Sequence, residues 1–224
     1  MNILLWKTYF DAAYLADAMG AADGAGWRAA ADKLAKSVRK SFWKDGFFSL
    51  SEDDPSMGFE ANALALATRF ATAEEAAAIM PRLVRVDHGK FQQLAARGKF
   101  EYGDAKGALK MLEDHNWYKL LDESWKGPRL TSECMHLHTR GWGDEAHPDT
   151  CVASLYTNYV LGITPLEPGF RVFVFKPLAA DLIDSASGEV PTPHGVIKAE
   201  WWHEGGKLRW KVVPPPGTRC EAGE

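Results

Sequence analysis

The chain has 224 residues, of which 46% are hydrophobic and 25% charged, and its formal net charge is −4. This composition is typical of a globular protein and argues against general disorder. Lysine and arginine are mixed with the acidic residues and form no basic stripe, so a nucleic-acid partner is not expected.

The N-terminal segment begins with apolar residues but is interrupted by charged side chains. Lys7, Asp11 and Asp17 fall within the first twenty positions, before a signal-peptide core or a membrane span of about 20 residues is complete. We therefore expect no membrane partner. The compartment stays open between a cytoplasmic and a secreted protein, and the sequence does not define the oligomeric state.

The first two thirds of the chain have the patterns of helices. Apolar residues recur at spacings of three and four, and glycines mark the ends of the runs. In "TAEEAAAIMPRL", Thr72 and Glu75 have the spacing of a capping box. Helices are predicted over about 5–19, 27–42, 58–70, 72–83, 90–98, 103–113 and 149–161. Because short breaks join them in pairs, we expect stacked helical hairpins.

The pattern changes in "GITPLEPGF" at 162–170, where two prolines and two glycines end the helical region. Alternating apolar and polar residues then predict strands in "FRVFVFKP", "GVIKAEWWHE" and "KLRWKVVP". Gly205 and Gly206 can adopt the positive φ angles of a tight hairpin turn between the last two. The expected fold class is α+β, with a helical domain over 1–165 and a β domain over 166–224.

Three motifs give the chain a family resemblance. They are "FEANALALA" at 59–67, the linker L-G-I-x-P-x-x-P-G-F at 161–170, and G-x-V-P-T-P-x-G-x-I at 188–197. In this order they closely resemble the C-terminal portion of bacterial-type α-L-rhamnosidases. The resemblance covers essentially the whole chain. It implies a partial (α/α)6 six-hairpin toroid followed by a small antiparallel β-sandwich.

The resemblance also implies that much of the family's catalytic domain is missing from this sequence. A complete six-hairpin ring needs far more than the roughly 165 residues that precede the sheet. The family's acid-rich segment, which supplies the catalytic proton donor, lies N-terminal to the part represented here, and the sequence has no counterpart. We expect a truncated chain, a C-terminal fragment that is inactive alone.

The segment "KGPRLTSEC" places Glu133 where the family has its general base. The match is one of position, because Ser132 stands where the family has Trp, and only Thr131 remains of its Thr pair. In an inverting glycosidase one carboxylate removes a proton from water while a second, protonated carboxyl assists the leaving group. The alternative is that Glu133 is a solvated or salt-bridged loop acid.

Three further residues are candidates for substrate binding. The resemblance places His147 where the family has a His before the last toroid helix, so it could bond a sugar hydroxyl. Alternatively, His147 and Asp149 cap that helix, with Pro148 in its first turn. Trp142 and Trp125 could stack on the apolar face of a pyranose ring, and core packing is the alternative for each.

Metal and thiol chemistry have weaker support in the sequence. His136, His138 and His147 could be read as metal ligands, but no strand or second-shell carboxylate supports this, so neither a metal nor a cofactor is expected. Cys134, Cys151 and Cys220 have no CxxC spacing, so they predict neither a zinc site nor a complete disulfide framework, although one pair could bridge. No G-x-S-x-G motif points to a serine nucleophile.

The leading hypothesis is a glycoside hydrolase related to α-L-rhamnosidases, whose intact parent removes terminal α-L-rhamnosyl groups by inversion. Its partner is then a rhamnose-containing carbohydrate. Two alternatives remain open. One is a non-catalytic carbohydrate-binding or interaction module, and the other is a six-hairpin glycosidase with a different sugar specificity.

Overall fold

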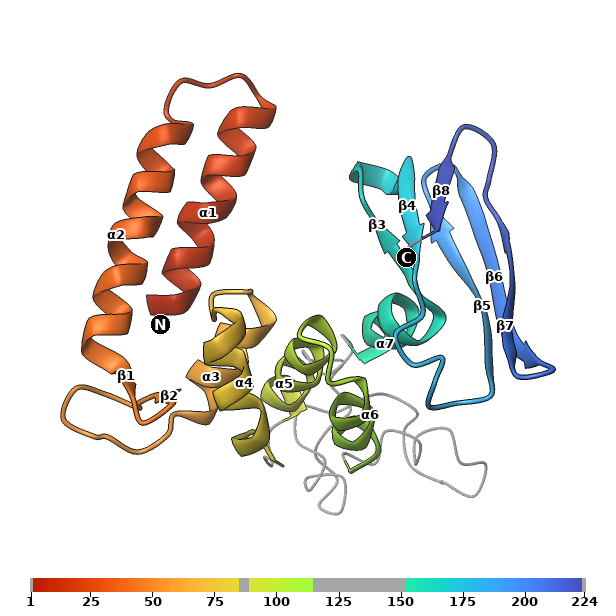
Figure 1. Ribbon diagram of the computed structural model, residues 1–224. Coiled ribbons are helices and arrows are strands. Elements are labelled where there is room, and N and C mark those ends of the chain that lie inside the picture. Colours follow the sequence, from red (N-terminus) through yellow and green to blue (C-terminus); the bar gives the residue numbers. More distant parts are fainter. Residues whose placement is uncertain (1, 85–88, 115–151, 223–224) are drawn as a thin grey trace, which may run out of the picture. The chain divides into compact units, whose positions relative to one another are not determined.

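The structure is a computed structural model that describes residues 2–84, 89–114 and 152–222 (Figure 1). The chain divides into two units, Met1–His147 and Pro148–Glu224, which are described separately. The first is built of helices and one small hairpin. The second combines one helical segment with two three-stranded sheets. The domain division expected at residue 165 stays a prediction.

The first unit begins with a long helical hairpin, α1 (Asn2–Ala18) and α2 (Gly24–Phe42), as the periodicity predicted. Gly20, with φ 67°, takes the left-handed conformation that follows α1. The two helices lie side by side (Figure 1). Tyr9 stacks on Trp27 with ring centroids 5.7 Å apart, and Arg28 pairs with Asp17 across the hairpin.

A two-stranded hairpin that the sequence did not predict follows α2. It consists of β1 (Trp43–Lys44) and β2 (Phe47–Phe48), which pair antiparallel. Asp45 and Gly46 form its turn with φ angles of 52° and 84°, the conformation that Asp-Gly favours in two-residue hairpin loops. The sequence "KDG" at 44–46, which follows the predicted helix, therefore also forms the turn of this hairpin.

The next helices are α3 (Phe59–Ala67) and α4 (Ala73–Ile79), followed by the 3₁₀ turn η1 (Met80–Arg82). The predicted capping box is confirmed. The backbone N–H of Glu75 donates to Thr72 Oγ1 at 3.2 Å, and the N–H of Thr72 donates to Glu75 Oε2 at 2.9 Å. These bonds satisfy two N–H groups that the first turn of α4 leaves unpaired.

Small residues bring α3 close to α5 (Gly89–Glu101), which is followed by α6 (Ala105–Asp114). Ala63 on α3 and Ala95 and Ala96 on α5 are fully buried. A methyl group at Gly98 would lie 2.3 Å from Leu66 Cβ, so the two helices approach too closely there for any side chain. The helix α5 ends at Glu101, three residues beyond the predicted end at 98.

The second unit starts with α7 (Val152–Leu155), which continues as the π-helical segment η5 (Tyr156–Leu161). The strands are β3 (Ile163–Pro165), β4 (Val172–Phe175), β5 (Ser185–Thr192), β6 (Gly195–Glu204), β7 (Lys207–Val213) and β8 (Arg219–Ala222), with the 3₁₀ turn η6 (Pro168–Phe170) before β4. The strands predicted in the three alternating segments are confirmed as β4, β6 and β7.

The two sheets differ in strand direction. The sheet β5-β6-β7 is antiparallel throughout. In the sheet β3-β4-β8, β3 pairs antiparallel and β8 parallel with β4, so this sheet is mixed rather than purely antiparallel. The turn between β6 and β7 is the predicted one, with φ angles of 59° at Gly205 and 74° at Gly206.

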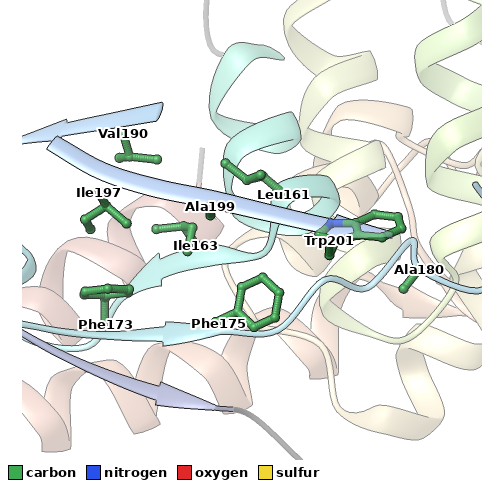
Figure 2. Packing of buried hydrophobic residues seen from close by; sticks show 9 residues of the cluster. All are labelled: Leu161, Ile163, Phe173, Phe175, Ala180, Val190, Ile197, Ala199 and Trp201. Carbon is green, nitrogen blue, oxygen red and sulfur yellow. The ribbon is translucent and has the colours of Figure 1, made fainter. Parts of the chain in front are cut away.

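The inner faces of both sheets share one hydrophobic core (Figure 2). Its members come from the end of η5, from β3 and β4, from the segment after β4, and from β5 and β6: Leu161, Ile163, Phe173, Phe175, Ala180, Val190, Ile197, Ala199 and Trp201. The Trp201 indole N–H donates to the Val160 carbonyl at 3.0 Å. This bond satisfies the polar group of a side chain that is otherwise fully buried.

Gly162 joins the helical segment to the first strand of the core. It has φ 88°, and a Cβ there would lie 2.4 Å from the backbone nitrogen of Pro177. The N–H of Lys176 donates to the Gly162 carbonyl at 2.8 Å. Both the left-handed conformation and the close backbone approach require glycine at this position of the linker motif.

Candidate functional site

The residues that the sequence nominated for chemistry lie outside the described part of the chain. These are Glu133, His147, Trp142 and Trp125, together with His136 and His138. Their proposed roles therefore stay predictions. The described residues instead show surfaces of the two units that could hold a small ligand.

The first unit contains an apolar cleft of about 320 Å³ between the helical hairpin, the β1–β2 hairpin and α3. Its apolar walls include Ile3, Val38, Phe42, Phe48, Leu50 and Leu64. Ser49 and Ser51 add polar groups at the start of the segment after β2. Concave, mostly apolar surfaces with a few polar groups are the usual form of small-molecule sites.

Asn62 fixes the position of the β1–β2 hairpin beside this cleft. Its side chain is fully buried. Its Oδ1 accepts from the N–H of Phe48 at 2.9 Å, and its Nδ2 donates to the carbonyls of Phe48 and Gly58, both at 2.7 Å. Both amide hydrogens are thus used within the protein. The asparagine of the "FEANALALA" motif is an anchor for backbone rather than a ligand for substrate.

An acidic segment, residues 52–54, follows β2, and the hydrogen bonds of Asp54 decide whether this carboxyl could donate a proton. The N–H of Asp54 donates to Ser51 Oγ at 2.9 Å, and Asp54 Oδ1 accepts from the N–H of Ser56 at 2.9 Å. Hydrogen bonding from Ser56 lowers the pKa of Asp54 below its ordinary value. This carboxylate is ionised at neutral pH, so Asp54 is a poor candidate for a general acid.

The described residues offer no metal site, because in that part of the chain no group of three or more His, Cys, Asp or Glu side chains could hold an ion. Within the same residues, no helix is both long and apolar enough to cross a membrane. Cys220, a free thiol on β8, is half-buried, and burial raises its pKa above the ordinary value. The raised pKa leaves less of the reactive thiolate at neutral pH.

The strand-rich part of the second unit matches a known protein family. Residues 162–222 match the family described as "Bacterial alpha-L-rhamnosidase C-terminal domain". The C-terminal region of this chain is of the bacterial α-L-rhamnosidase type. An "Alpha-L-rhamnosidase" of Formosa agariphila is 32% identical over 62 residues, which are 28% of this chain and 7% of that protein.

Solved α-L-rhamnosidases share the fold of nearly the whole chain. The native enzyme of Aspergillus terreus aligns with a TM-score of 0.75 and 20% identity over 94% of this chain. The enzyme of Dictyoglumus thermophilum aligns with 0.76 and 16% over 98%. That of Streptomyces avermitilis, solved with L-rhamnose, aligns with 0.66 and 16% over 99%. This chain covers 26%, 26% and 22% of those structures respectively, about a quarter of their length.

The motif residues in the rhamnosidase-type region serve its fold. Gly162 makes the close turn into β3, while Val190 and Ile197 are core residues. A Cβ at Gly188 would lie 3.1 Å from Leu161 Cδ2, so this position also favours a small residue. The sequence resemblance is confirmed here, and its physical basis is packing rather than catalysis.

Proposed function

We propose that the chain is the C-terminal part of a glycoside hydrolase that removes terminal α-L-rhamnosyl groups from glycosides. The observation that carries the proposal is the match of residues 162–222 to the rhamnosidase C-terminal domain. The likeness of fold to solved α-L-rhamnosidases over 94% or more of the chain supports it. The substrate class, α-L-rhamnosides, is taken from the names of those relatives, which are all α-L-rhamnosidases.

In the proposed architecture the helices of the first unit form part of an (α/α)6 ring, and the two sheets form a β-sandwich. The apolar residues exposed on α1 are evidence for this proposed ring. Leu4, Phe10, Tyr14 and Leu15 are 46%, 53%, 62% and 56% exposed, although the opposite side of α1 packs on α2. A helix that is apolar around most of its circumference is typical of one with neighbours on more than one side.

In the proposed mechanism Glu133 is the general base of an inverting reaction. Its carboxylate removes a proton from a water molecule that attacks the anomeric carbon, while a protonated carboxyl about 6.5 to 9.5 Å away protonates the leaving oxygen. His147 bonds a sugar hydroxyl, and Trp142 or Trp125 stacks on the pyranose ring. This chemistry uses two carboxyl groups and water, so it needs no cofactor.

Hydrolysis of 4-nitrophenyl α-L-rhamnopyranoside tests the function. We expect turnover by a longer protein that contains this chain as its C-terminal part, and a loss of at least about a hundredfold in kcat on Glu133→Gln. Failure of that longer protein on the rhamnoside, with turnover of another nitrophenyl glycoside, would favour the alternative of a different sugar specificity.

The 224-residue chain alone is expected to be inactive, because the resemblance places the proton donor outside it. The same assay on the purified chain checks this. Turnover that disappears on Glu133→Gln would support the proposed base and contradict the expected inactivity.

A further inference from the structure

The outer face of the sheet β5-β6-β7 has an ordered arrangement of side chains. Because successive side chains of a strand point to opposite faces, the register places three cross-strand rows on the face away from the core. The rows are Ser185, Trp202 and Arg209; Ser187, Glu200 and Lys211; and Glu189, Lys198 and Val213. We call these nine residues the outer face.

Two neighbouring tryptophans on β6 have opposite environments. Trp201 is 1% exposed in the core, whereas Trp202 is 37% exposed on the outer face. The core of the second unit does not include Trp202. An indole that stays accessible on a polar sheet face offers a flat apolar surface with a hydrogen-bonding edge, which suits a ligand with one apolar face and polar groups around it.

The charged groups near Trp202 balance one another. Lys198 pairs with Glu189 at 2.9 Å, Lys211 with Glu200 at 3.6 Å, and Arg209 with Glu204, the last residue of β6, at 3.2 Å. Every partner is at least 47% exposed, and exposed pairs of this kind contribute little to stability. The sum of the six charges is zero, so the surface has no preference for a polyanion.

Two shallow hollows adjoin this face. One, of about 340 Å³, is lined by residues of all three strands, including Glu200, Lys198 and Lys211. The other, of about 300 Å³, lies between β5 and η5, where Tyr156 is 43% exposed. Both hollows are lined by residues 187–189 of β5. Charged side chains of the outer face line the first hollow, and the accessible aromatic side chain of Tyr156 lines the second.

We propose that the outer face binds a neutral saccharide, with a pyranose ring stacked on Trp202. Carboxylates that accept and ammonium groups that donate match hydroxyls, each of which can do both. Glu200 and Lys211, in the row next to Trp202, are the groups placed to bond the ring hydroxyls. The outer face includes none of the residues proposed for hydrolysis, so it would hold carbohydrate without cleaving it.

The test is a titration of the ¹⁵N-labelled 224-residue chain followed by NMR of the indole N–H signals. The probes are L-rhamnose, D-glucose, D-galactose and D-galacturonate, each to about 50 mM, which detects millimolar dissociation constants. The choice of L-rhamnose rests on the proposed function. We expect a neutral sugar to shift the Trp202 signal in a saturable way, and galacturonate to bind no better.

Variants then identify the site. Trp202→Ala should weaken binding at least about tenfold, and Lys211→Gln should weaken it while leaving the Trp202 signal in place as a reporter. Trp27→Ala is the matched control, because Trp27 is also 37% exposed but lies on α2. Far-UV circular dichroism verifies that each variant is folded.

Three results would overturn the proposal: no shift with any neutral sugar, an affinity unchanged by Trp202→Ala, or stronger binding of galacturonate. The charged rows would then be a solubilising surface only. The outcome is separable from the proposed function. In a longer protein that hydrolyses the nitrophenyl rhamnoside, Trp202→Ala should leave kcat/KM for that small substrate within about twofold.

Discussion

At the scale of single residues, Glu75 holds together three parts of the first unit. Its carboxylate caps the N-terminus of α4 and also accepts from Arg39 on α2, with Oε1 2.7 Å from Nε and Oε2 3.0 Å from Nη2. Arg39 donates in addition to the Phe70 carbonyl at 2.7 Å. Planar two-point contacts between arginine and a carboxylate are among the stronger hydrogen-bonded pairs, and Glu75 is almost fully buried.

Glu75→Gln should therefore lower the free energy of unfolding by about 1 to 3 kcal/mol. Glutamine can still cap α4, but it removes the negative charge and leaves the buried side of Arg39 poorly paired. Urea denaturation followed by circular dichroism measures the change. Glu74→Gln, at an exposed neighbouring position, is the control and should change stability by less than about 0.5 kcal/mol. Equal effects of the two substitutions would contradict this role of Glu75.

Tyr102 gives the first unit a pH dependence in the alkaline range. Its hydroxyl donates to the Ala71 carbonyl, and burial raises the pKa of the phenol above its ordinary value, with Arg69 acting in the opposite direction. Above pH about 10 the unfolded chain loses this proton first. The stability contributed by the protonated phenol is thus complete below pH 10 and is lost as the pH rises further.

Tyr102→Phe should remove the contribution of the phenol hydroxyl to stability. Because the hydrogen bond is lost, the free energy of unfolding at pH 7 should fall by about 1 kcal/mol. Unfolding of both proteins at pH 7 and at about pH 10.5 provides the comparison. The difference in stability between wild type and variant should shrink at the higher pH. If this stability difference instead grows with pH, the predicted direction of the pH dependence is wrong.

At the scale of elements, the crossing of α3 and α5 depends on the absence of a side chain at Gly98. A Cβ there would meet Leu66 Cβ at 2.3 Å and the backbone nitrogen of Ala67 at 3.2 Å. Gly98→Ala should destabilise the protein by about 1 to 3 kcal/mol by overpacking, despite the better helix propensity of alanine.

Gly26 in α2 is the matched control, because nothing lies within 4 Å of a Cβ added there. Gly26→Ala should leave stability unchanged or raise it by up to about 1 kcal/mol. Thermal and urea unfolding of both variants check the pair. Stabilisation by Gly98→Ala would mean that the helices separate without cost.

At the scale of the whole molecule, the exposed side of α1 offers a test of the proposed ring. Leu15 is 56% exposed here, so Leu15→Glu should change the stability of this chain by less than about 0.5 kcal/mol. If a further helix of the proposed ring packs on α1, the same substitution in a longer protein should cost about 2 to 5 kcal/mol, because it would bury an unpaired charge.

Ala16→Glu is the internal reference for both proteins. Ala16 is 6% exposed in this chain, so a glutamate there should destabilise the chain and the longer protein alike. Leu15→Glu that leaves the longer protein unaffected would argue against a helix packed on this side of α1.

The outcome of the sequence predictions depended on where the deciding interactions lie. The helices predicted between residues 5 and 113, the capping box at Thr72 and Glu75 and the turn at Gly205 and Gly206 are confirmed, because their determinants lie within a few neighbouring residues. The strand β5 was not predicted. Its sequence, "SASGEVPT", has little strand propensity, and it forms a strand through pairing with β6. The proposed catalytic residues lie outside the described part, so for them the sequence remains the only guide.

The sequence by itself determined which part of the chain is helical and which is rich in strands. It also determined the tight turns and the family that residues 162–222 match. Periodicity, caps and motif glycines act locally, so the sequence carries this information directly. Only the tertiary structure decided that the Asn62 amide bonds backbone groups and that α3 and α5 cross at Gly98. It also decided that Trp201 is buried while Trp202 is accessible. These facts depend on which distant segments meet. Burial and contact are properties of the packed chain, and local pattern does not specify them.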